Sequence, residues 1–311
     1  MNINKILISG SHGMVGHNLV DHLKSLSSAC TLLTPIHKEC ELLDRTCVAS
    51  YLSESKPDLI IHCAGTVGGI QANVSNPVKF LYENMQMGLN LVLEAFEHKI
   101  PRLINLGSSC MYPYAAPNPL KEEMVLSGAL EPTNEGYALA KCAITRLCQY
   151  INHTDSSFQY KTLIPCNLYG PYDKFDERAH MIPAIIKKID TAITEGTDTV
   201  EILGDGTARR EFMYAGDLAQ CIAMAIERFD DLPELMNIGL GYDYTVDEYY
   251  EKIRMILGYS GSFVHNTKKP SGMKQKLVDV SLQTKFGFKP KTSLEEGIRK
   301  TYEYYKTLQT K

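Results

Sequence analysis

The stretch Lys5–Gly16, "KILISGSHGMVG", joins a short apolar run to a glycine-rich turn, and a helical pattern of apolar residues continues from it to residue 26. A strand followed by such a turn and a helix is the start of a dinucleotide-binding unit. Glycine permits the tight turn, lets a pyrophosphate approach the backbone, and lets the helix pack closely on the strand. The spacing is G-x-x-G-x-x-G rather than the commoner G-x-G-x-x-G. We therefore expect the cofactor to contact Gly10, His12, Gly13, Met14, Val15 and Gly16.

Beyond this turn, short apolar runs alternate with helical patterns, and the runs lie at residues 31–33, 59–64, 102–107 and 160–165. This alternation predicts an α/β protein with a Rossmann-type, doubly wound parallel sheet covered by helices on both faces. After residue 170 the strands become less regular. We expect residues 1–170 to form the dinucleotide-binding domain, with later segments returning to it, and residues 171–311 to form mainly a smaller lobe.

Composition narrows the class of protein. The 311 residues carry a net charge of −4 without a basic face, so we expect no nucleic acid and no membrane as partner. No apolar run approaches the ~20 residues of a membrane span, and the N-terminus has no signal-peptide pattern. Nine cysteines without a C-x-x-C pair predict free thiols, no metal site, and a cytoplasmic location.

The residues after the second predicted strand bear on cofactor choice. An NAD-binding protein carries an acidic residue at the end of this strand. Here Pro35, His37 and Lys38 precede Glu39. Together with His12, the residues His37 and Lys38 can meet a 2′-phosphate, so NADP(H) is favoured, although NAD(H) remains an alternative.

Tyr137 and Lys141 are four residues apart at the start of a predicted helix. The spacing places both side chains on one helix face, one turn apart. We expect the ammonium to lower the pKa of the phenol from its usual ~10. The phenol can then exchange a proton with a carbonyl or alcohol while hydride moves at the neighbouring carbon.

The glycine turn, the serine-rich strand end "LGSSCMYP" (106–113) and the Tyr-x-x-x-Lys pair together resemble the extended short-chain dehydrogenase/reductase superfamily. The resemblance implies that a serine joins Tyr137 and Lys141 in catalysis. Ser108, four residues before Tyr112, is the expected serine, and Ser109 is the alternative.

Six collinear segments are similar to the GDP-L-fucose synthase family: "TVGGIQAN" (66–73), "LGSSCMYP" (106–113), "LEPTNEGYALAK" (130–141), "NLYGPYDKF" (167–175), "HMIPA" (180–184) and "GDGTARREF" (204–212). The resemblance implies C3/C5 epimerisation and C4 reduction of a GDP-4-keto-6-deoxy-mannose or of a related deoxyhexose or deoxyheptose. In that reading Cys110 and His180 are the base and acid pair. The chemistry is reasonable, because hydrogens beside a C4 ketone are acidified by enolate formation.

The same resemblance implies further contacts of the chain with its ligands. Arg210 would meet the diphosphate, whereas Lys188 and Lys276 could equally be solvated cations, and Leu203 stands where the family has an aromatic residue. His12 and His37 stand in place of two arginines. The remaining cofactor contacts would be Ala64, Tyr137, Lys141, Pro165, Asn167, Leu168 and His180, and the substrate contacts would be Ser109, Asn167, Lys188, Leu203, Arg210 and Lys276.

The resemblance also implies a homodimer that pairs the helix in 77–98 with the Tyr137 helix across a two-fold axis. Three alternatives stay open at this point. The chain could be a C4 reductase only, an epimerase at a single position, or a non-catalytic NAD(P)-binding regulator.

Overall fold

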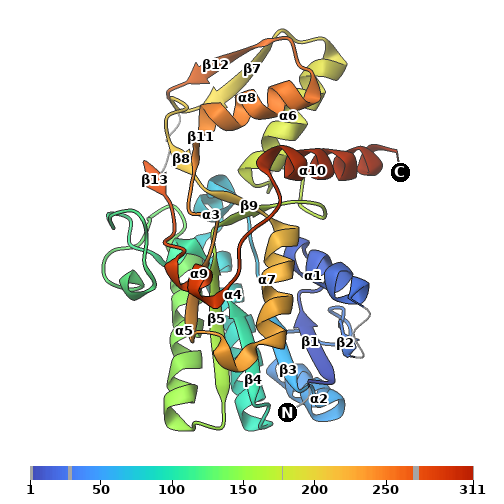
Figure 1. Ribbon diagram of the computed structural model, residues 1–311, viewed down its shortest axis with the longest axis vertical. Helices are drawn as coiled ribbons and strands as arrows, with labels where there is room; N and C mark the ends of the chain where they lie inside the picture. Colours follow the sequence, from blue (N-terminus) through green and yellow to red (C-terminus); the bar gives the residue numbers. More distant parts are fainter. Residues whose placement is uncertain (1–2, 27–29, 177, 269–272, 311) are drawn as a thin grey trace.

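The computed structural model describes residues 3–26, 30–176, 178–268 and 273–310. Its centre is a six-stranded sheet in the order β10-β5-β4-β3-β1-β2, and every neighbouring pair is parallel (Figure 1). The chain leaves β1 toward β2 on one side and later continues through β3 on the other, which is the doubly wound arrangement. The strands are β1 Lys5–Ser9, β2 Thr31–Leu33, β3 Leu59–His62, β4 Arg102–Leu106, β5 Gln159–Pro165 and β10 Leu235–Ile238.

Helices cover both faces of this sheet. Ile6 and Ile8 of β1 pack in a core shared with α1 and α7, whereas Leu7 packs in a second core shared with α2, α4 and α5. Burial on both faces is the reason why β1 is apolar at consecutive positions. The predicted fold class is thereby confirmed. The helices of this part are α1 Met14–Ser25, α2 Arg45–Ser55, α3 Ile70–Ser75, α4 Pro77–Glu97, α5 Glu135–Thr154, α7 Ala215–Glu227 and α9 Ser281–Phe286.

The remaining elements form a lobe above the carboxyl ends of the strands (Figure 1). A third apolar core lies between α6, α8 and α10. Three small sheets complete the lobe: β6 with β9, β7 with β12, and β11-β8-β13. Their bounds are α6 Met181–Glu195, α8 Val246–Leu257, α10 Leu294–Gln309, β6 Asn167–Tyr169, β7 Thr199–Leu203, β8 Arg209–Arg210, β9 Phe212–Tyr214, β11 Tyr244–Thr245, β12 Ser262–Asn266 and β13 Gln275–Lys276.

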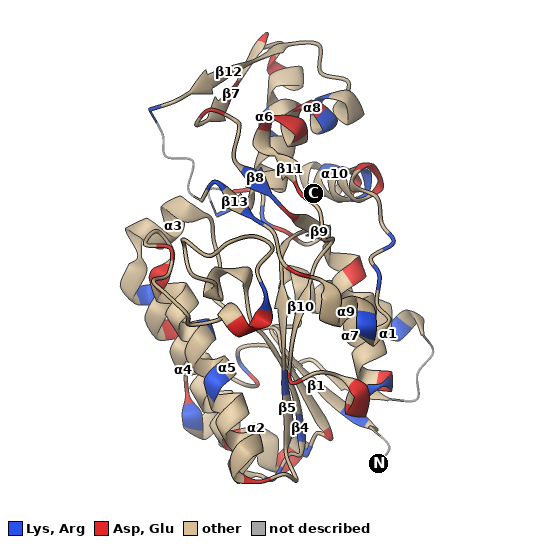
Figure 2. Ribbon diagram, turned by 60° about the vertical axis from the view of Figure 1, so that its left-hand side comes forward, with Lys and Arg blue, Asp and Glu red and all other residues tan. Residues whose placement is uncertain are grey.

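Residues 275–279, which we call the strap, run between the two parts of the molecule. On one side β13 pairs with β8 of the lobe. On the other side Leu120, in the loop that follows β4, bridges to Val278. Basic residues on β8 and β13 therefore lie between the lobe and the sheet (Figure 2).

The boundary predicted at residue 170 remains a prediction. Two elements that follow it, α7 and β10, lie in the sheet and its covering layer. The sequence pattern had not identified β10 as a strand. None of the helices within the described residues is long and apolar enough to cross a membrane.

Candidate active site

The glycine turn after β1 leaves no room for side chains at two positions. Gly10 has a φ of +69°, and a Cβ there would lie 2.6 Å from the backbone of Ala64. A Cβ on Gly16 would lie 2.2 Å from the carbonyl oxygen of Gly10. The helix that follows begins at Met14 and has no acidic residue in its first turn. A close backbone, a helix N-terminus and the lack of an acidic residue in its first turn, which also contains Val15, fit a pyrophosphate.

The two histidines predicted to meet a 2′-phosphate are both exposed. The Nδ1 atom of His12 lies 3.1 Å from the Ser11 hydroxyl. His37 follows β2, and its Nδ1 lies 3.2 Å from a carboxylate oxygen of Glu41. Glu41 therefore attracts the same imidazole that a cofactor phosphate would attract, so the two anions compete for it.

At the end of β4 the chain turns into a short 3₁₀ helix, Ser109–Met111. The hydroxyl of Ser108 accepts a hydrogen bond from the Cys110 amide at 3.2 Å, which caps this helix. The same hydroxyl is hydrogen-bonded to the phenol of Tyr137. Ser109 is buried, whereas Cys110 is only partly so. This turn thus presents Ser108 and Cys110 side by side at the carboxyl end of the sheet.

Lys141 lies beneath this turn and is buried. Its ammonium donates a hydrogen bond to the Leu106 carbonyl at 2.8 Å and lies 5.8 Å from the centre of the Tyr137 ring. Burial lowers the pKa of Lys141 to about 8. The predicted pair on one helix face is therefore present, and it faces the end of β4.

The expectation of a lowered phenol pKa is wrong. Burial raises the pKa of Tyr137, nearby Cys110 raises it further, and the hydrogen bond with Ser108 only partly offsets these effects. The physical reason is that this helix face packs against the sheet, so desolvation disfavours the phenolate. Tyr137 consequently stays protonated at neutral pH, as a proton donor must be.

The sulfur of Cys110 has two donors. The Asn134 side-chain amide lies at 3.3 Å and the Lys276 ammonium at 3.7 Å. Asn134 was not predicted as a site residue, although it belongs to the segment 130–141 and precedes Tyr137 by three residues. Lys276 was predicted, but as a substrate ligand.

His180 stands at the N-terminus of α6, and its Nδ1 lies 3.2 Å from the buried carboxylate of Asp173. Burial lowers the pKa of His180, but the hydrogen bond and charge of Asp173 outweigh it, so the pKa is raised. Asp173 was not predicted, although it lies in the segment 167–175. Among the described residues, no hydrogen bond joins His180 to Cys110.

The predicted substrate ligands lie on several elements of the lobe. Arg210 on β8 is half-buried and donates to the Arg209 carbonyl at 2.8 Å. Lys188 on α6 donates to the Glu201 carbonyl at 3.2 Å, so it is held against β7. Leu203 ends β7 and is 49% exposed.

The other predicted cofactor contacts follow the sheet edge. Pro165 ends β5, and the chain continues through Cys166 into β6, which contains Asn167 and Leu168. Asn167 donates to the backbone carbonyl of Glu211 at 2.9 Å, which fixes its side chain toward β9. Within the described ranges, no cluster of three His, Cys, Asp or Glu side chains could hold a metal ion.

Comparisons with known proteins place the chain among enzymes of sugar nucleotides. Residues 6–239 match the NAD dependent epimerase/dehydratase family. The chain is 56% identical to a GDP-L-colitose synthase of Yersinia pseudotuberculosis, with 97% of each chain covered. It is 46% identical to a GDP-L-fucose synthase of Azorhizobium caulinodans, covering 97% of this chain and 96% of the other. A GDP-mannoheptose C4 reductase from Campylobacter jejuni, solved with NADP bound, superposes with a TM-score of 0.88 at 32% identity, covering 98% and 99%.

Proposed function

Because the chain belongs to the NAD dependent epimerase/dehydratase family, and within it to the GDP-L-fucose synthase group, we propose that it epimerises a GDP-linked 4-keto-6-deoxy sugar and then reduces the C4 ketone with NADPH. It is an NADP(H)-dependent epimerase/reductase of a GDP-sugar. One observation carries the assignment of residues: the contacts from Lys141 and Tyr137 through Ser108 to Cys110 bring reductase and epimerase groups into one site.

The epimerase step uses Cys110 and His180. The sulfur of Cys110 takes the proton at C3 or C5, and the electron pair of the broken C–H bond moves into the enolate at C4. His180, whose pKa is raised by Asp173, returns a proton to the opposite face of that carbon. The carbon skeleton and the oxidation state are unchanged, so only the configuration is inverted.

The reductase step uses Tyr137, Ser108 and Lys141. Bound NADPH supplies the hydride that adds to C4. Tyr137 donates its phenolic proton to the oxygen at C4, and Ser108 holds the phenol in place by their hydrogen bond. Lys141, buried beneath the turn, stabilises the phenolate that remains.

The site has groups suited to both ligands. The turn at Gly10 and the first turn of α1 would hold the pyrophosphate of the cofactor, with His12 and His37 near its 2′-phosphate. Arg210 would meet the diphosphate of the sugar nucleotide, since a guanidinium matches that geometry. Lys188 and the exposed Leu203 lie on the same lobe and would border the nucleotide.

A second candidate is a single-position epimerase. The relative with 56% identity is named for colitose and the one with 46% for fucose. Colitose is a 3,6-dideoxy sugar, so C3 of its precursor is not a stereocentre and only C5 would be inverted. The two candidates share all catalytic groups and differ in the number of carbons that exchange hydrogen.

The test is to offer GDP-, dTDP- and UDP-linked 4-keto-6-deoxy sugars and GDP-4-keto-3,6-dideoxy-mannose with NADPH or NADH in deuterated water. Loss of reduced cofactor reports reduction, and NMR of the product reports deuterium at C3 and C5. We expect turnover of a GDP-sugar with NADPH. Deuterium at both carbons supports the first candidate. A strong preference for the 3-deoxy sugar over the other GDP-linked sugars supports the second. No turnover of any GDP-linked sugar would disprove the function.

Two variants test which residues carry out the reduction and which carry out the epimerisation. Tyr137→Phe should lose reduction by about 10²-fold or more while still exchanging deuterium into the sugar. Cys110→Ser should lose deuterium uptake and keep reduction of a substrate that already has the product configuration. Unchanged uptake in Cys110→Ser would show that another group is the base.

We further propose that the protein is a cytoplasmic homodimer. The buried thiols of Cys40, Cys142, Cys148, Cys166 and Cys221 are free, as expected in a reducing compartment. Val78 and Tyr82 on α4 and Leu139 and Tyr150 on α5 are exposed apolar side chains. Each pair lies on one face of its helix, and α4 and α5 pack against each other, so a second copy could cover both faces.

A further inference from the structure

The side chain of Glu131 lies in the turn that leads into α5 and is only 7% exposed. One of its carboxylate oxygens, Oε1, accepts from the Thr133 hydroxyl at 3.1 Å. The other oxygen, Oε2, is buried and has no hydrogen-bond partner among the described residues. The same turn holds a second such acceptor, the buried Oδ1 of Asn134. Burying a carboxylate oxygen without a donor is costly, so we expect a ligand to supply one.

This turn lies beside the cysteine proposed as the epimerase base. The backbone amide of Asn134 donates to the Glu131 carbonyl at 3.1 Å, which closes the turn. The side-chain amide of Asn134 donates to the Cys110 sulfur at 3.3 Å, which fixes the turn against the end of β4. The carboxylate of Glu131 is therefore held within three residues of a direct contact with the group that would act on the sugar ring.

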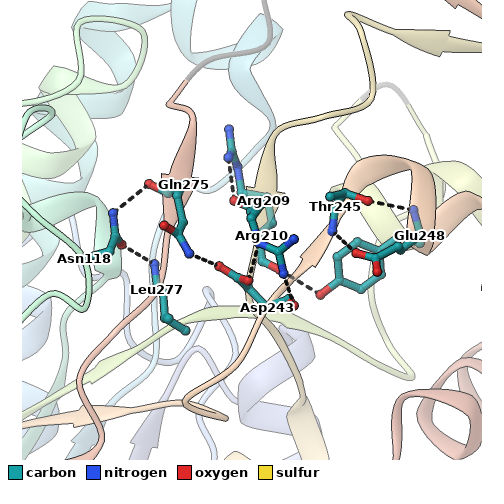
Figure 3. A network of polar contacts seen from close by, with 9 residues as sticks. Asn118, Arg209, Arg210, Asp243, Thr245, Glu248, Gln275 and Leu277 are labelled. Atoms are coloured by element: carbon teal, nitrogen blue, oxygen red, sulfur yellow. Dashed lines mark hydrogen bonds and ion pairs between the residues drawn. The ribbon is translucent and has the colours of Figure 1, made fainter.

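Glu131 also lies near Arg210, the residue proposed to meet the diphosphate. Burial lowers the pKa of Arg210, and the negative charges of Glu131 and Asp243 act in the opposite direction. Asp243 pairs with Arg209 at 2.7 Å and accepts from the Gln275 side chain (Figure 3). Glu131, in contrast, forms no ion pair within the part of the chain that the structure describes. Its charge therefore acts on Arg210 from a distance rather than through a contact.

We propose that Glu131 is a substrate-binding residue, whose Oε2 accepts a hydrogen bond from the C2 hydroxyl of the sugar. The diphosphate is attached at C1, and Cys110 would act at C3 or C5. A side chain that lies near both Arg210 and Cys110 therefore faces the part of the ring next to C1, which carries the C2 hydroxyl. The inference rests on the proposed function of this site.

The C2 hydroxyl suits this contact because the proposed reaction leaves it unchanged. Carbons C3 and C5 are inverted and C4 is reduced, whereas C2 keeps its configuration and its hydroxyl throughout. The hydroxyl is also present in both candidate substrates, the 4-keto-6-deoxy sugar and the 4-keto-3,6-dideoxy sugar. A hydrogen bond from a hydroxyl to a carboxylate is stronger than one between neutral groups. One such contact can therefore hold the ring through every step.

The test measures the binding of stable GDP-sugars, without any turnover. Calorimetry gives the Kd of GDP, of GDP-mannose, and of GDP-2-deoxyglucose, which is GDP-mannose without the C2 hydroxyl. The proteins are the wild type, Glu131→Met and Glu131→Gln, and Glu131→Gln keeps the size of the side chain should Glu131→Met fold poorly. Glu135→Gln, at an exposed glutamate four residues away, is the matched control.

We expect Glu131→Met to lower the affinity for GDP-mannose relative to GDP by about tenfold, because a hydrogen bond to a charged group is lost. Glu131→Gln should lower this ratio less, since one acceptor oxygen remains, and Glu135→Gln should keep it. The wild type should bind GDP-2-deoxyglucose about tenfold more weakly than GDP-mannose, and Glu131→Met should bind the two almost equally.

The proposal is overturned if both Glu131 variants keep the wild-type ratio of the GDP-mannose and GDP affinities, because the residue then contacts no part of the sugar. It is also overturned if Glu131→Met still prefers GDP-mannose over GDP-2-deoxyglucose as strongly as the wild type does. The use of a ratio to GDP removes any effect of the variants on Arg210 and the diphosphate.

This readout separates the inference from the proposed function. If a GDP-4-keto sugar is turned over but the affinity ratio does not change in the Glu131 variants, the inference fails and the proposed function stands. If the ratio falls as expected but no GDP-4-keto sugar is turned over, the contact is correct and the proposed function fails.

Discussion

The two side chains proposed to move protons at the sugar carbons are each held by a partner from another segment. Cys110 contacts Asn134 and Lys276, and His180 contacts Asp173. Asp173 raises the pKa of His180, which favours the imidazolium that a proton donor needs. Both groups are therefore held in place before the sugar arrives.

The contact between His180 and Asp173 leads to a prediction on pH dependence. In Asp173→Asn the burial of His180 is no longer offset, so its pKa falls below the usual value instead of being raised. The protonated form is present only below the pKa, so the fall of deuterium uptake with rising pH should begin at a lower pH. At pH 7.5 we expect uptake to drop by about tenfold or more.

The measurement is the pH profile of deuterium uptake at C3 and C5, with reduction of a pre-epimerised substrate as the internal control. Asp176→Asn, at the carboxylate that pairs with Arg178 on the surface of the same loop, is a matched variant and should keep the wild-type profile. An unchanged profile in Asp173→Asn would show that this carboxylate does not govern the acid.

At the level of elements, the turn between β1 and α1 is the proposed site of the cofactor pyrophosphate. Its three glycines are not equivalent. A Cβ at Gly16 would collide with the Gly10 carbonyl at 2.2 Å, whereas a Cβ at Gly13 would meet the same oxygen at an ordinary 3.4 Å. Helix packing therefore demands glycine at residue 16, and residue 13 tolerates a small side chain as far as the fold is concerned.

This difference predicts opposite outcomes for two alanine variants. Gly16→Ala should lower the free energy of unfolding by about 1–3 kcal/mol, because α1 must move away from β1. It should also weaken NADPH binding, since the helix end moves with it. Gly13→Ala should unfold like the wild type.

Thermal unfolding and NADPH fluorescence titration measure the two effects. The prediction fails if the two variants are destabilised equally, which would mean that the turn adapts at either position.

For the whole molecule, the site lies where the lobe meets the carboxyl ends of the strands. The strap links the two parts, and Tyr172, in the chain between β6 and α6, stacks on His17 of α1 with ring centres 4.2 Å apart. The residues proposed for the site come from both parts: Cys110 and Tyr137 from the part around the sheet, and His180, Arg210 and Lys276 from the lobe. Catalysis therefore depends on how the two parts are held together.

The proposed dimer gives a prediction at this scale. Tyr82→Glu places a charge beside Val78 on the exposed apolar face of α4, where Tyr82 is 58% exposed. We expect the variant to sediment as a monomer at micromolar concentration, because an uncompensated buried charge is costly at an interface. Met255→Glu, at an exposed apolar residue of α8, is the control and should leave the association state unchanged.

Analytical ultracentrifugation of both variants and the wild type measures the association state. A monomeric wild type, or a Tyr82→Glu variant that still dimerises, would show that α4 is not the interface.

Much of the fold could be predicted because its signals are local. The turn at Gly10 and the spacing of Tyr137 and Lys141 each depend on residues within one or two turns of chain. The sequence did not predict the strand β10, because its four residues follow a lobe whose hydrophobic pattern is irregular. Pairing with β5 at the edge of the sheet makes this segment a strand.

The sequence by itself determined the class of fold, and it predicted the reacting side chains and the turn that would receive the cofactor, because spacing along one helix or one turn indicates which groups share a face. Only the tertiary structure decided the state of those groups. It partly buried Tyr137, which reversed the expected direction of its pKa, and it brought Lys276 to Cys110 and Asp173 to His180. Desolvation and charge act through space, so they depend on how distant segments pack rather than on their order in the chain.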